Sequence, residues 1–251
     1  MTEQLSLAVL CVAGLGAGFV NAVAGGGSLL TLPALIFTGL DAHAANATNR
    51  IAILFQSGAA LGGYHRSGAR LPRQALWLAL PAAGSAAAGA YLSTRVGEDN
   101  LRLILAIALV AFLCLSLFPK PKREEGQRAM PSGPLFICGI CAIGFYAGFL
   151  QAGMGILTLL FLGWAHRMKL TEANVIKVYM LGCLTIFAIL TFIVEGAEFD
   201  LARGVLLAAS TSLGAFFGAR FGVSLSDRVV QALMVTAVSA SAAKLLYDFF
   251  A

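Results

Sequence analysis

The strongest constraint on the fold of this chain is its series of apolar runs, most of them long enough to cross a membrane. Charged residues gather in short clusters between the runs, such as those at 65–73, 120–128 and 167–169. Only 12% of the residues are charged and 59% are hydrophobic, whereas soluble domains carry about 25% charged residues. Because a helical span needs about 20 apolar residues, the pattern predicts an all-α polytopic membrane protein.

Two other classes of protein fit the sequence poorly. An outer-membrane barrel requires segments of about ten residues that alternate between apolar and polar side chains, and the run at 104–118 does not alternate. The net charge of +5 could suggest nucleic-acid binding, but the basic residues lie between apolar segments, where they orient a chain in a membrane. We therefore expect a lipid bilayer as a partner, and no nucleic acid.

The cysteines and the first residues give no sign of a secreted domain. All five cysteines lie within apolar segments, so they predict no disulfide framework. Cys138 and Cys141 form a CxxC pair, and packing of small residues one helical turn apart explains it better than a redox site. Residues 1–7 contain no basic region, so we expect a first membrane segment rather than a removed signal peptide.

Ten apolar segments follow one another along the chain. They are expected at roughly 4–23, 28–40, 45–64, 74–93, 101–118, 134–151, 154–165, 172–194, 203–219 and 228–247. The second and the seventh are too short for a straight span, so they are expected to be half-helices, re-entrant pieces or tilted segments. Eight long segments and two short ones result.

An internal repeat organises these segments. When the chain is shifted by 128 positions, the sequence AGGG at 24–27 aligns with AGMG at 152–155, and Ala45-Asn46 aligns with Ala173-Asn174. GLGAGF at 14–19 also resembles GFYAGF at 144–149 after a further shift of two residues. We therefore predict one five-segment repeat at 1–118, a cytoplasmic linker at 119–133 and a second five-segment repeat at 134–251.

An odd number of segments in each half requires the two halves to have opposite orientations in the membrane. If the linker is cytoplasmic, most of the lysines and arginines fall on the cytoplasmic side, as the positive-inside rule requires. The matching loops also differ in charge, because 65–73 is basic whereas 195–203 contains Glu195, Glu198 and Asp200. The sequence thus predicts an inverted repeat.

The duplicated glycine clusters are the first candidate for a binding site. Glycines interrupt a membrane helix where the freed backbone groups line a cavity or contact other protein, and each cluster precedes a short segment. Two exposed helix starts with the positive ends of their dipoles would form an anion site. The alternative is that these glycines only allow close helix packing.

Polar residues surround the glycine clusters, and each half places one cation about one turn into the same helix. Arg50 and Lys177 are the two cations; an unpaired charge at this depth indicates function, and the alternative is snorkelling of the long side chains to the membrane surface. The predicted substrate-binding residues are Asn21, Gly25, Gly26, Gly27, Thr48, Asn49, Arg50, Gln151, Gly153, Gly155, Asn174, Lys177 and Tyr179.

Enzymatic chemistry finds little support in the sequence. All twelve carboxylates lie at segment ends or in loops, so no buried proton relay is expected. Asp41 and Glu172 are predicted to cap helices rather than carry protons. Phosphate-loop, zinc-protease and nucleophile-elbow motifs are absent from the sequence, and Ser28 lacks a neighbouring base. We predict no catalytic residue, no metal site and no cofactor.

The first glycine cluster and its flanks, GFVNAVAGGGSLLTLP at 18–33, followed by 45–50, resemble the TauE/SafE sulfite exporter family. GFLQAGMG at 148–155 is similar to the second motif of that family, with Met154 where a glycine-rich run is common. The resemblance covers nearly the whole chain. It implies a multi-pass permease of the bacterial cytoplasmic membrane that moves small sulfur oxyanions or organosulfonates.

Together these expectations describe a secondary transporter that exports a small sulfur-containing anion, sulfite or an organosulfonate such as sulfoacetate, by alternating access between two inverted repeats. The anion is expected to bind between the two glycine breaks. An anionic substrate is preferred because the planar fork of an arginine suits a carboxylate, a sulfonate or a phosphate. A channel or an importer for another small anionic solute is the alternative within transport. An intramembrane enzyme or a structural membrane subunit is the alternative from another class. An oligomer is possible, but the sequence does not indicate one.

Overall fold

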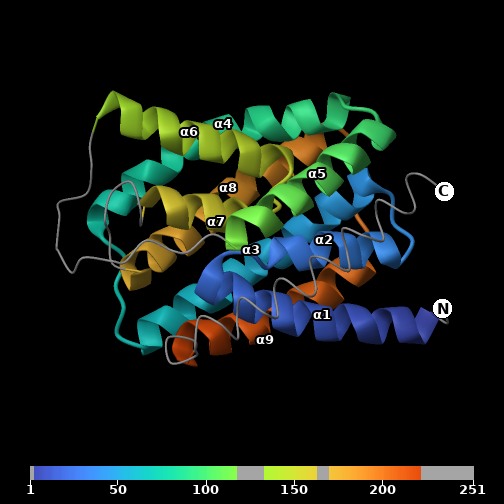
Figure 1. Ribbon diagram of the computed structural model, residues 1–251, viewed down its shortest axis with the longest axis horizontal. Helices are drawn as coiled ribbons and strands as arrows, with labels where there is room; N and C mark the ends of the chain where they lie inside the picture. Colours follow the sequence, from blue (N-terminus) through green and yellow to red (C-terminus); the bar gives the residue numbers. More distant parts are fainter. Residues whose placement is uncertain (1–2, 118–132, 163–169, 222–251) are drawn as a thin grey trace.

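The structure is a computed structural model that describes residues 3–117, 133–162 and 170–221. Within these residues the chain forms nine α-helices and no strand (Figure 1). The helices are α1 (Glu3–Ala24), α2 (Ser28–Phe37), α3 (Ala42–Arg66), α4 (Arg73–Arg95), α5 (Glu98–Leu117), α6 (Pro134–Phe149), α7 (Met154–Leu160), α8 (Leu170–Val194) and α9 (Leu201–Phe221). The predicted segment at 228–247 and nearly all of the linker lie outside the described residues.

Four of the described helices are long and apolar enough to cross a membrane by length and composition: Gln4–Ala24, Ala75–Arg95, Thr171–Val194 and Leu201–Phe221. α2 and α6 are apolar but shorter. Large apolar side chains cover the outside of the bundle; Val12 is 71% exposed and Trp77 is 74% exposed. Such a surface is stable against lipid tails and unfavourable in water.

Corresponding helices in the two parts of the chain begin or end at the same spacing that the sequence repeat has. The last residues of α3 and α8, Arg66 and Val194, lie 128 positions apart. α4 and α9 begin at Arg73 and Leu201, with the same separation. The turns before them contain Gly68 and Gly196, both with positive φ, at 85° and 72°. The helical register therefore repeats over the described residues.

Charge distinguishes the two ends of the bundle. Loops 38–41, 96–97 and 195–200 meet at one end, because Arg95 pairs with Glu195 at 2.7 Å and Arg203 donates to Thr38 O at 3.2 Å. We call this the acidic end, since it gathers six carboxylates: Asp41, Glu98, Asp99, Glu195, Glu198 and Asp200. The opposite end, where α3 and α9 finish, is the basic end and includes Arg66, Arg70, Arg73 and Arg220.

Corresponding helices run in opposite directions between these ends. α3 begins at the acidic end, where Glu98 binds its first N–H groups, and α8 finishes there, beside Arg95. α1 runs toward the basic end, since Ala22 O accepts from Tyr64 near the end of α3. α6 runs toward the acidic end, where Asn46 near the start of α3 donates to Phe149 O.

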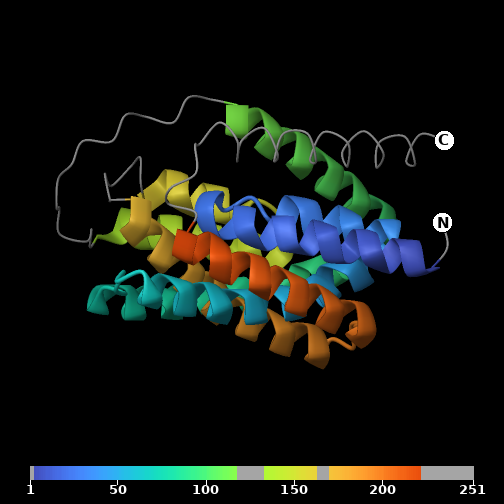
Figure 2. The same ribbon diagram turned by 90° about the horizontal axis from the view of Figure 1, so that it is seen from below.

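Packing pairs helices from different parts of the chain. α9 lies against α1 and α3, and α4 lies against α6 and α8, with α3 and α8 in contact between these groups (Figures 1 and 2). Figure 2 shows α5 crossing the other helices obliquely on one side. Its buried residues Leu101, Leu105 and Leu109 share a core cluster with Leu29 of α2 and Ile156 of α7.

Candidate functional site

Two breaks interrupt the helices at the predicted glycine clusters. α1 ends at Ala24, and Gly25 has φ 82°; α6 ends at Phe149, and Gln151 and Gly153 have φ 63° and 73°. This left-handed region is readily adopted by glycine but costs other residues about 1 kcal/mol or more. Gly25 and Gly153 lie 128 positions apart. Both helices thus stop inside the bundle. From these breaks α2 and α7 run in directions opposite to each other.

The two breaks contact each other and form a central junction, residues 24–28 and 150–155. A Cβ atom added to Gly25 would lie 2.8 Å from Ile156 N, and one added to Gly155 would lie 2.6 Å from Gly25 Cα. Ser28 Oγ donates to Gln151 O at 3.1 Å and accepts from Gly153 N at 3.2 Å. Only glycine allows this approach of the two backbones.

Arg50 binds the carbonyl groups at the end of α6. It is 1% exposed; its Nη1 donates to Ala147 O at 2.5 Å and its Nη2 to Gly148 O at 2.7 Å. Asn46 Nδ2 donates to the next carbonyl, Phe149 O, at 2.9 Å. We call this group the arginine cap. Because the last carbonyls of a helix have no intrahelical partner and carry its negative dipole, a cation there is favourable.

Lys177 binds the end of α1 in the same way. It is fully buried; its Nζ donates to Asn21 O at 2.6 Å, to Ala22 O at 3.1 Å and to Asn174 Oδ1 at 2.7 Å. Asn174 Nδ2 donates to Val23 O at 3.3 Å. This group is the lysine cap. An ammonium group has three N–H donors, so all donors of Lys177 have partners, whereas Arg50 Nε has none in the described structure.

No carboxylate of the described residues contacts either buried cation; their hydrogen bonds go to carbonyls and asparagine side chains. The end of a helix carries about half a negative charge, which leaves each cap with about half a positive charge. The start of α2 adds about half a positive charge more at the junction. The centre of the bundle is therefore electropositive.

Several buried polar atoms near these groups have no hydrogen-bond partner among the described residues. They are Thr31 Oγ1, both amide atoms of Asn49, Gln56 Oε1 and Gln151 Oε1. Asn49 is fully buried and precedes Arg50 directly, and Gln151 belongs to the junction, where its Nε2 donates to Thr185 Oγ1 at 2.9 Å. An unsatisfied buried polar group costs about 1–3 kcal/mol, so water or a ligand is expected to bind there.

The structure brings most of the predicted site residues to the junction or the caps. Asn21 contributes its carbonyl to the lysine cap, and Gly26 and Gly27 accept from the first N–H groups of α2. Two predicted residues lie elsewhere. Thr48 Oγ1 accepts from Asp200 N at 2.9 Å, beside α9, and Tyr179 is only half-buried, beside Cys183.

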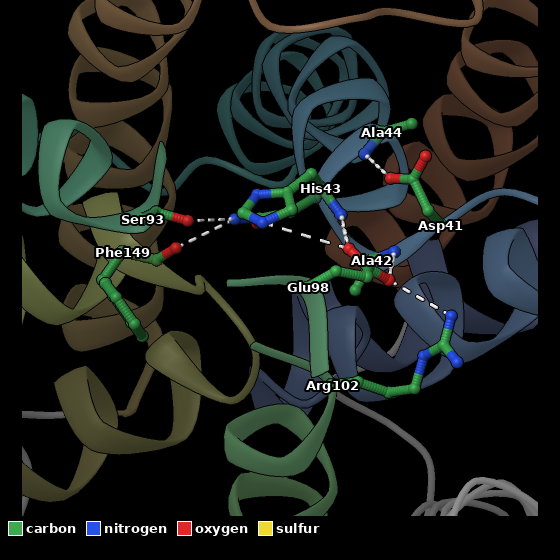
Figure 3. A network of polar contacts seen from close by, with 9 residues as sticks. Asp41, Ala42, His43, Ala44, Ser93, Glu98, Arg102 and Phe149 are labelled. Atoms are coloured by element: carbon green, nitrogen blue, oxygen red, sulfur yellow. Dashed lines mark hydrogen bonds and ion pairs between the residues drawn. The ribbon is translucent and has the colours of Figure 1, made fainter. Parts of the chain in front are cut away.

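Carboxylates at the acidic end cap the start of α3 (Figure 3). Asp41 is the N-cap residue and accepts from Ala44 N at 2.7 Å, as the sequence predicted. Glu98 accepts from Ala42 N at 2.6 Å and His43 N at 3.3 Å, and it pairs with Arg102 at 3.1 Å. Among the described residues no three His, Cys, Asp or Glu side chains could hold a metal ion.

Sequence reasoning gave no role to several residues that complete the caps. Tyr64 donates to Ala22 O at 2.7 Å, Arg50 lies 5.4 Å from the ring centre of Phe192, and Ser93 accepts from Asn46 at 3.1 Å. Tyr64 and Phe192 lie 128 positions apart. The repeat could therefore have indicated this aromatic pair, whereas nothing in the sequence marks Ser93.

The chain is similar over nearly its whole length to proteins named as probable membrane transporters. A family model described as "Sulfite exporter TauE/SafE" matches residues 10–245. "Probable membrane transporter protein YfcA" of Escherichia coli (strain K12) is 32% identical over 250 residues, which cover 99% of this chain and 92% of that protein. "Probable membrane transporter protein ORF9" of Sinorhizobium sp is 30% identical over 243 residues, with coverages of 96% and 93%.

A "Probable membrane transporter protein" of Haemophilus influenzae is 26% identical over 247 residues, covering 96% of this chain and 95% of that protein. No solved structure matches the chain. The range that the family model matches, 10–245, includes both glycine clusters and both caps.

Proposed function

Because the chain belongs to the sulfite exporter TauE/SafE family and is a multi-pass membrane transporter, we propose that it exports a small sulfur-containing anion. Sulfite and organosulfonates such as sulfoacetate are the proposed substrates. Transport proceeds by alternating access, with the anion bound at the central junction between two inverted repeats. Bacterial cytoplasmic membrane is the proposed location, with the basic end facing the cytoplasm.

The observation that supports an anionic substrate best is the pair of buried cations without a carboxylate partner. Arg50 and Lys177 are 1% and 0% exposed, and transferring a charge to the interior costs several kcal/mol. The carbonyl groups of α6 and α1 compensate only part of each charge. An anion at the junction completes the compensation, whereas a cation there would be repelled from both sides.

The groups that contact the anion follow from the donors still available. Lys177 acts through its charge, since its three N–H groups are already bound. The proposed direct contacts are Arg50 Nε, Asn49 Nδ2 and the N–H groups of Gly26 and Gly27, which have no hydrogen-bond partner among the described residues. Sulfite and sulfonates present three oxygen acceptors, so several weak donors arranged around one point suit them.

The proposed membrane topology has ten segments in two inverted repeats, 1–118 and 134–251, joined by a cytoplasmic linker at 119–133. The matching ends of α3 and α8 and the matching starts of α4 and α9 support it, as do the opposite directions of these helices. The charge difference between the basic and the acidic end supports the orientation.

Thermal stabilisation by anions tests this function. Purified protein is titrated with sulfite, sulfoacetate and isethionate, with acetate as the carboxylate control. A bound ligand stabilises the folded protein by about 2.7 kcal/mol at a hundredfold excess over Kd. We expect sulfur anions to raise the melting temperature and acetate to have no effect; no response to any of these anions would contradict the proposal.

Asn49→Leu is the decisive variant, because Asn49 has no hydrogen-bond partner to lose among the described residues. It should fold normally and lose the response to sulfite. Thr211→Val is the matched control, since Thr211 is also fully buried and its hydroxyl binds only its own helix. Flux of labelled sulfite into proteoliposomes then separates the mechanisms: saturable flux indicates a carrier, and unsaturable flux indicates the alternative, a channel.

A further inference from the structure

The packing of the helices divides the described part of the molecule differently from the sequence repeat. α9, from the second half of the chain, lies against α1 and α3 from the first half. α4, from the first half, lies against α6 and α8 from the second half. We define bundle A as α1, α2, α3 and α9, and bundle B as α4, α6, α7 and α8. The two halves of the chain have thus exchanged α4 and α9.

Close backbone contacts hold each bundle together. A Cβ atom added to Gly214 of α9 would meet the main chain of α1 at Leu15 and lie 3.0 Å from Phe19 N. Within bundle B, one added to Gly148 of α6 would lie 2.7 Å from Ala86 Cα of α4. Helices that approach this closely cannot slide or tilt against each other without a steric clash. Each bundle is therefore expected to move as one body.

Between the bundles, the described glycines allow an equally close backbone approach only at the junction, which must therefore be the pivot of any motion of one bundle against the other. Apart from the junction and a crossing of α3 and α8 near Ser57, where a Cβ on Gly182 would lie 3.4 Å from Ser57 Cβ, the main polar links are the two caps. The arginine cap joins α3 of bundle A to α6 of bundle B toward the acidic end. The lysine cap joins α8 of bundle B to α1 of bundle A toward the basic end.

The chain passes between the bundles at turns that can act as hinges. The turn from α3 to α4 contains Gly68, and the turn from α8 to α9 contains Gly196. Both glycines have positive φ, and no atom lies within 4 Å of a Cβ placed on either. Hinges are commonly a few residues at element ends that absorb changes in φ and ψ. Matching hinges therefore connect the bundles at opposite ends of the molecule.

We propose that the moving parts of the transporter are bundles A and B, not the two halves of the sequence, and that the two caps are the gates. Opening toward the acidic end breaks the arginine cap, and opening toward the basic end breaks the lysine cap. Both caps are closed in this structure, which is therefore the occluded state. The proposal rests on transport by alternating access, but the identity of the substrate does not enter it.

Spin-label distances test which parts move, without any transport assay. Leu5 of α1 is 51% exposed, Leu213 of α9 56% and Leu80 of α4 60%, so each can be replaced by a labelled cysteine in a background without the five native cysteines. Leu5 and Leu213 belong to one bundle but different halves of the chain. Leu5 and Leu80 belong to one half but different bundles. Each pair is measured in nanodiscs with and without sulfite.

We expect a single unchanging distance for Leu5→Cys with Leu213→Cys, and two populations for Leu5→Cys with Leu80→Cys. The reverse pattern, or single unchanging distances for both pairs, would overturn the proposal. The second pair could also show two distance populations whose proportions do not change with sulfite. That result would support bundles A and B as the moving parts and contradict sulfite as the substrate. The two proposals can thus be contradicted separately.

A disulfide between α1 and α9 tests by a transport assay whether these two helices move together. In Gly14→Cys with Ser210→Cys, the new Cβ at 14 lies 3.1 Å from Cβ of 210, slightly inside the usual disulfide range of about 3.5–4.5 Å. The nearest obstacle is the hydroxyl of Ser210, which the substitution removes. The oxidised protein should transport at the rate of the reduced protein. Loss of transport on oxidation, with recovery on reduction, would show that the sequence halves move.

Discussion

The arginine cap and the lysine cap bind equivalent ends of two interrupted helices, yet they use different chemistry. At the arginine cap a guanidinium group binds two carbonyls and lies over the ring of Phe192. At the lysine cap an ammonium group binds two carbonyls, and Tyr64, the counterpart of Phe192 in the repeat, adds a hydroxyl donor to one of them. An aromatic residue thus supports the cation in one cap and a carbonyl in the other.

The carbonyl oxygens of the two caps also differ in how many hydrogen-bond donors they have. Asn21 O also accepts from Gly25 N at 3.1 Å, and Ala22 O also accepts from Tyr64. Ala147 O and Gly148 O have no partner other than Arg50 among the described residues. In both halves of the chain a cation binds the carbonyl groups at a helix end inside the bundle. Only in the lysine cap do those carbonyl groups have a second donor.

Removal of each cation gives the largest expected contrast. Arg50→Met leaves two buried carbonyls without a partner, at about 1–3 kcal/mol each, whereas Lys177→Met leaves both carbonyls with one partner and should cost about 1 kcal/mol. Unfolding in mixed detergent micelles, followed by circular dichroism, measures both. Arg95→Gln, at an exposed ion pair, is the control and should cost less than about 1 kcal/mol. Equal costs for the two caps would contradict the comparison.

A double-mutant cycle sharpens the role of Tyr64. Tyr64→Phe removes one of two donors to Ala22 O and should cost about 0.5–1.5 kcal/mol. Combined with Lys177→Met, it leaves Ala22 O without any donor. The double variant should therefore lose about 1–3 kcal/mol more than the sum of the single variants. An additive result would mean that the two donors do not share this carbonyl.

Arg50→Lys separates charge from geometry at the arginine cap. A lysine keeps the positive charge but loses the planar fork that reaches Ala147 O and Gly148 O together. We expect a loss of about 1 kcal/mol in stability and a retained stabilisation by sulfite. Arg50→Gln, measured beside it, should lose the sulfite response. If both variants respond to sulfite equally, the charge of Arg50 plays no part in binding.

The smallest expected effect concerns the loop beside the arginine cap, where Asp200 N donates to Thr48. The backbone N–H and then the guanidinium of Arg203 hold the pKa of Asp200 below its usual value. A lowered folded pKa stabilises the protein above the unfolded pKa, about 3.9, and this contribution disappears as the pH falls through the folded value. At pH 7 the free energy of unfolding of the wild type should exceed that of Asp200→Asn by less than about 1 kcal/mol. This difference in stability should disappear only below about pH 4.

Unfolding from pH 7 to pH 3 measures this gap, and a gap that is constant over the range would contradict the assignment. The lysine cap offers the comparison. Ile176, which corresponds to Thr48, has no hydroxyl to bind a loop. Acid should therefore loosen the end near the arginine cap and leave the other cap unchanged.

The sequence predicted the helices of this molecule better than their packing. Predicted segments such as 45–64 and 172–194 agree closely with α3 (Ala42–Arg66) and α8 (Leu170–Val194), because run length and glycine position are local signals. The exchange of α4 and α9 between the bundles was not predictable in this way. A helix face that contacts lipid and one that contacts protein are both apolar, so no pattern in the sequence distinguishes them.

In the candidate site, too, the sequence predicted features of single residues better than their contacts. Burial of Arg50 and Lys177 was predicted from their depth in an apolar run, and the alternative of snorkelling is wrong, since they are 1% and 0% exposed. Their partners were not predicted, because Arg50 lies 97 positions from Ala147 and Lys177 lies 156 positions from Asn21. Thr48 and Asn49 are adjacent in the sequence, but a step of one residue turns a helix by about 100°, and only Thr48 contacts the α8–α9 loop.

The absence of described carboxylates beside the two buried cations has an electrical consequence. If the proposed anion crosses at the junction without a proton, its full charge moves across the membrane. A potential of 100 mV, negative inside, acts on each elementary charge with about 2.3 kcal/mol, equivalent to a concentration ratio of about fifty. Voltage alone would then drive the anion outward, and the export rate would follow the membrane potential rather than the pH gradient.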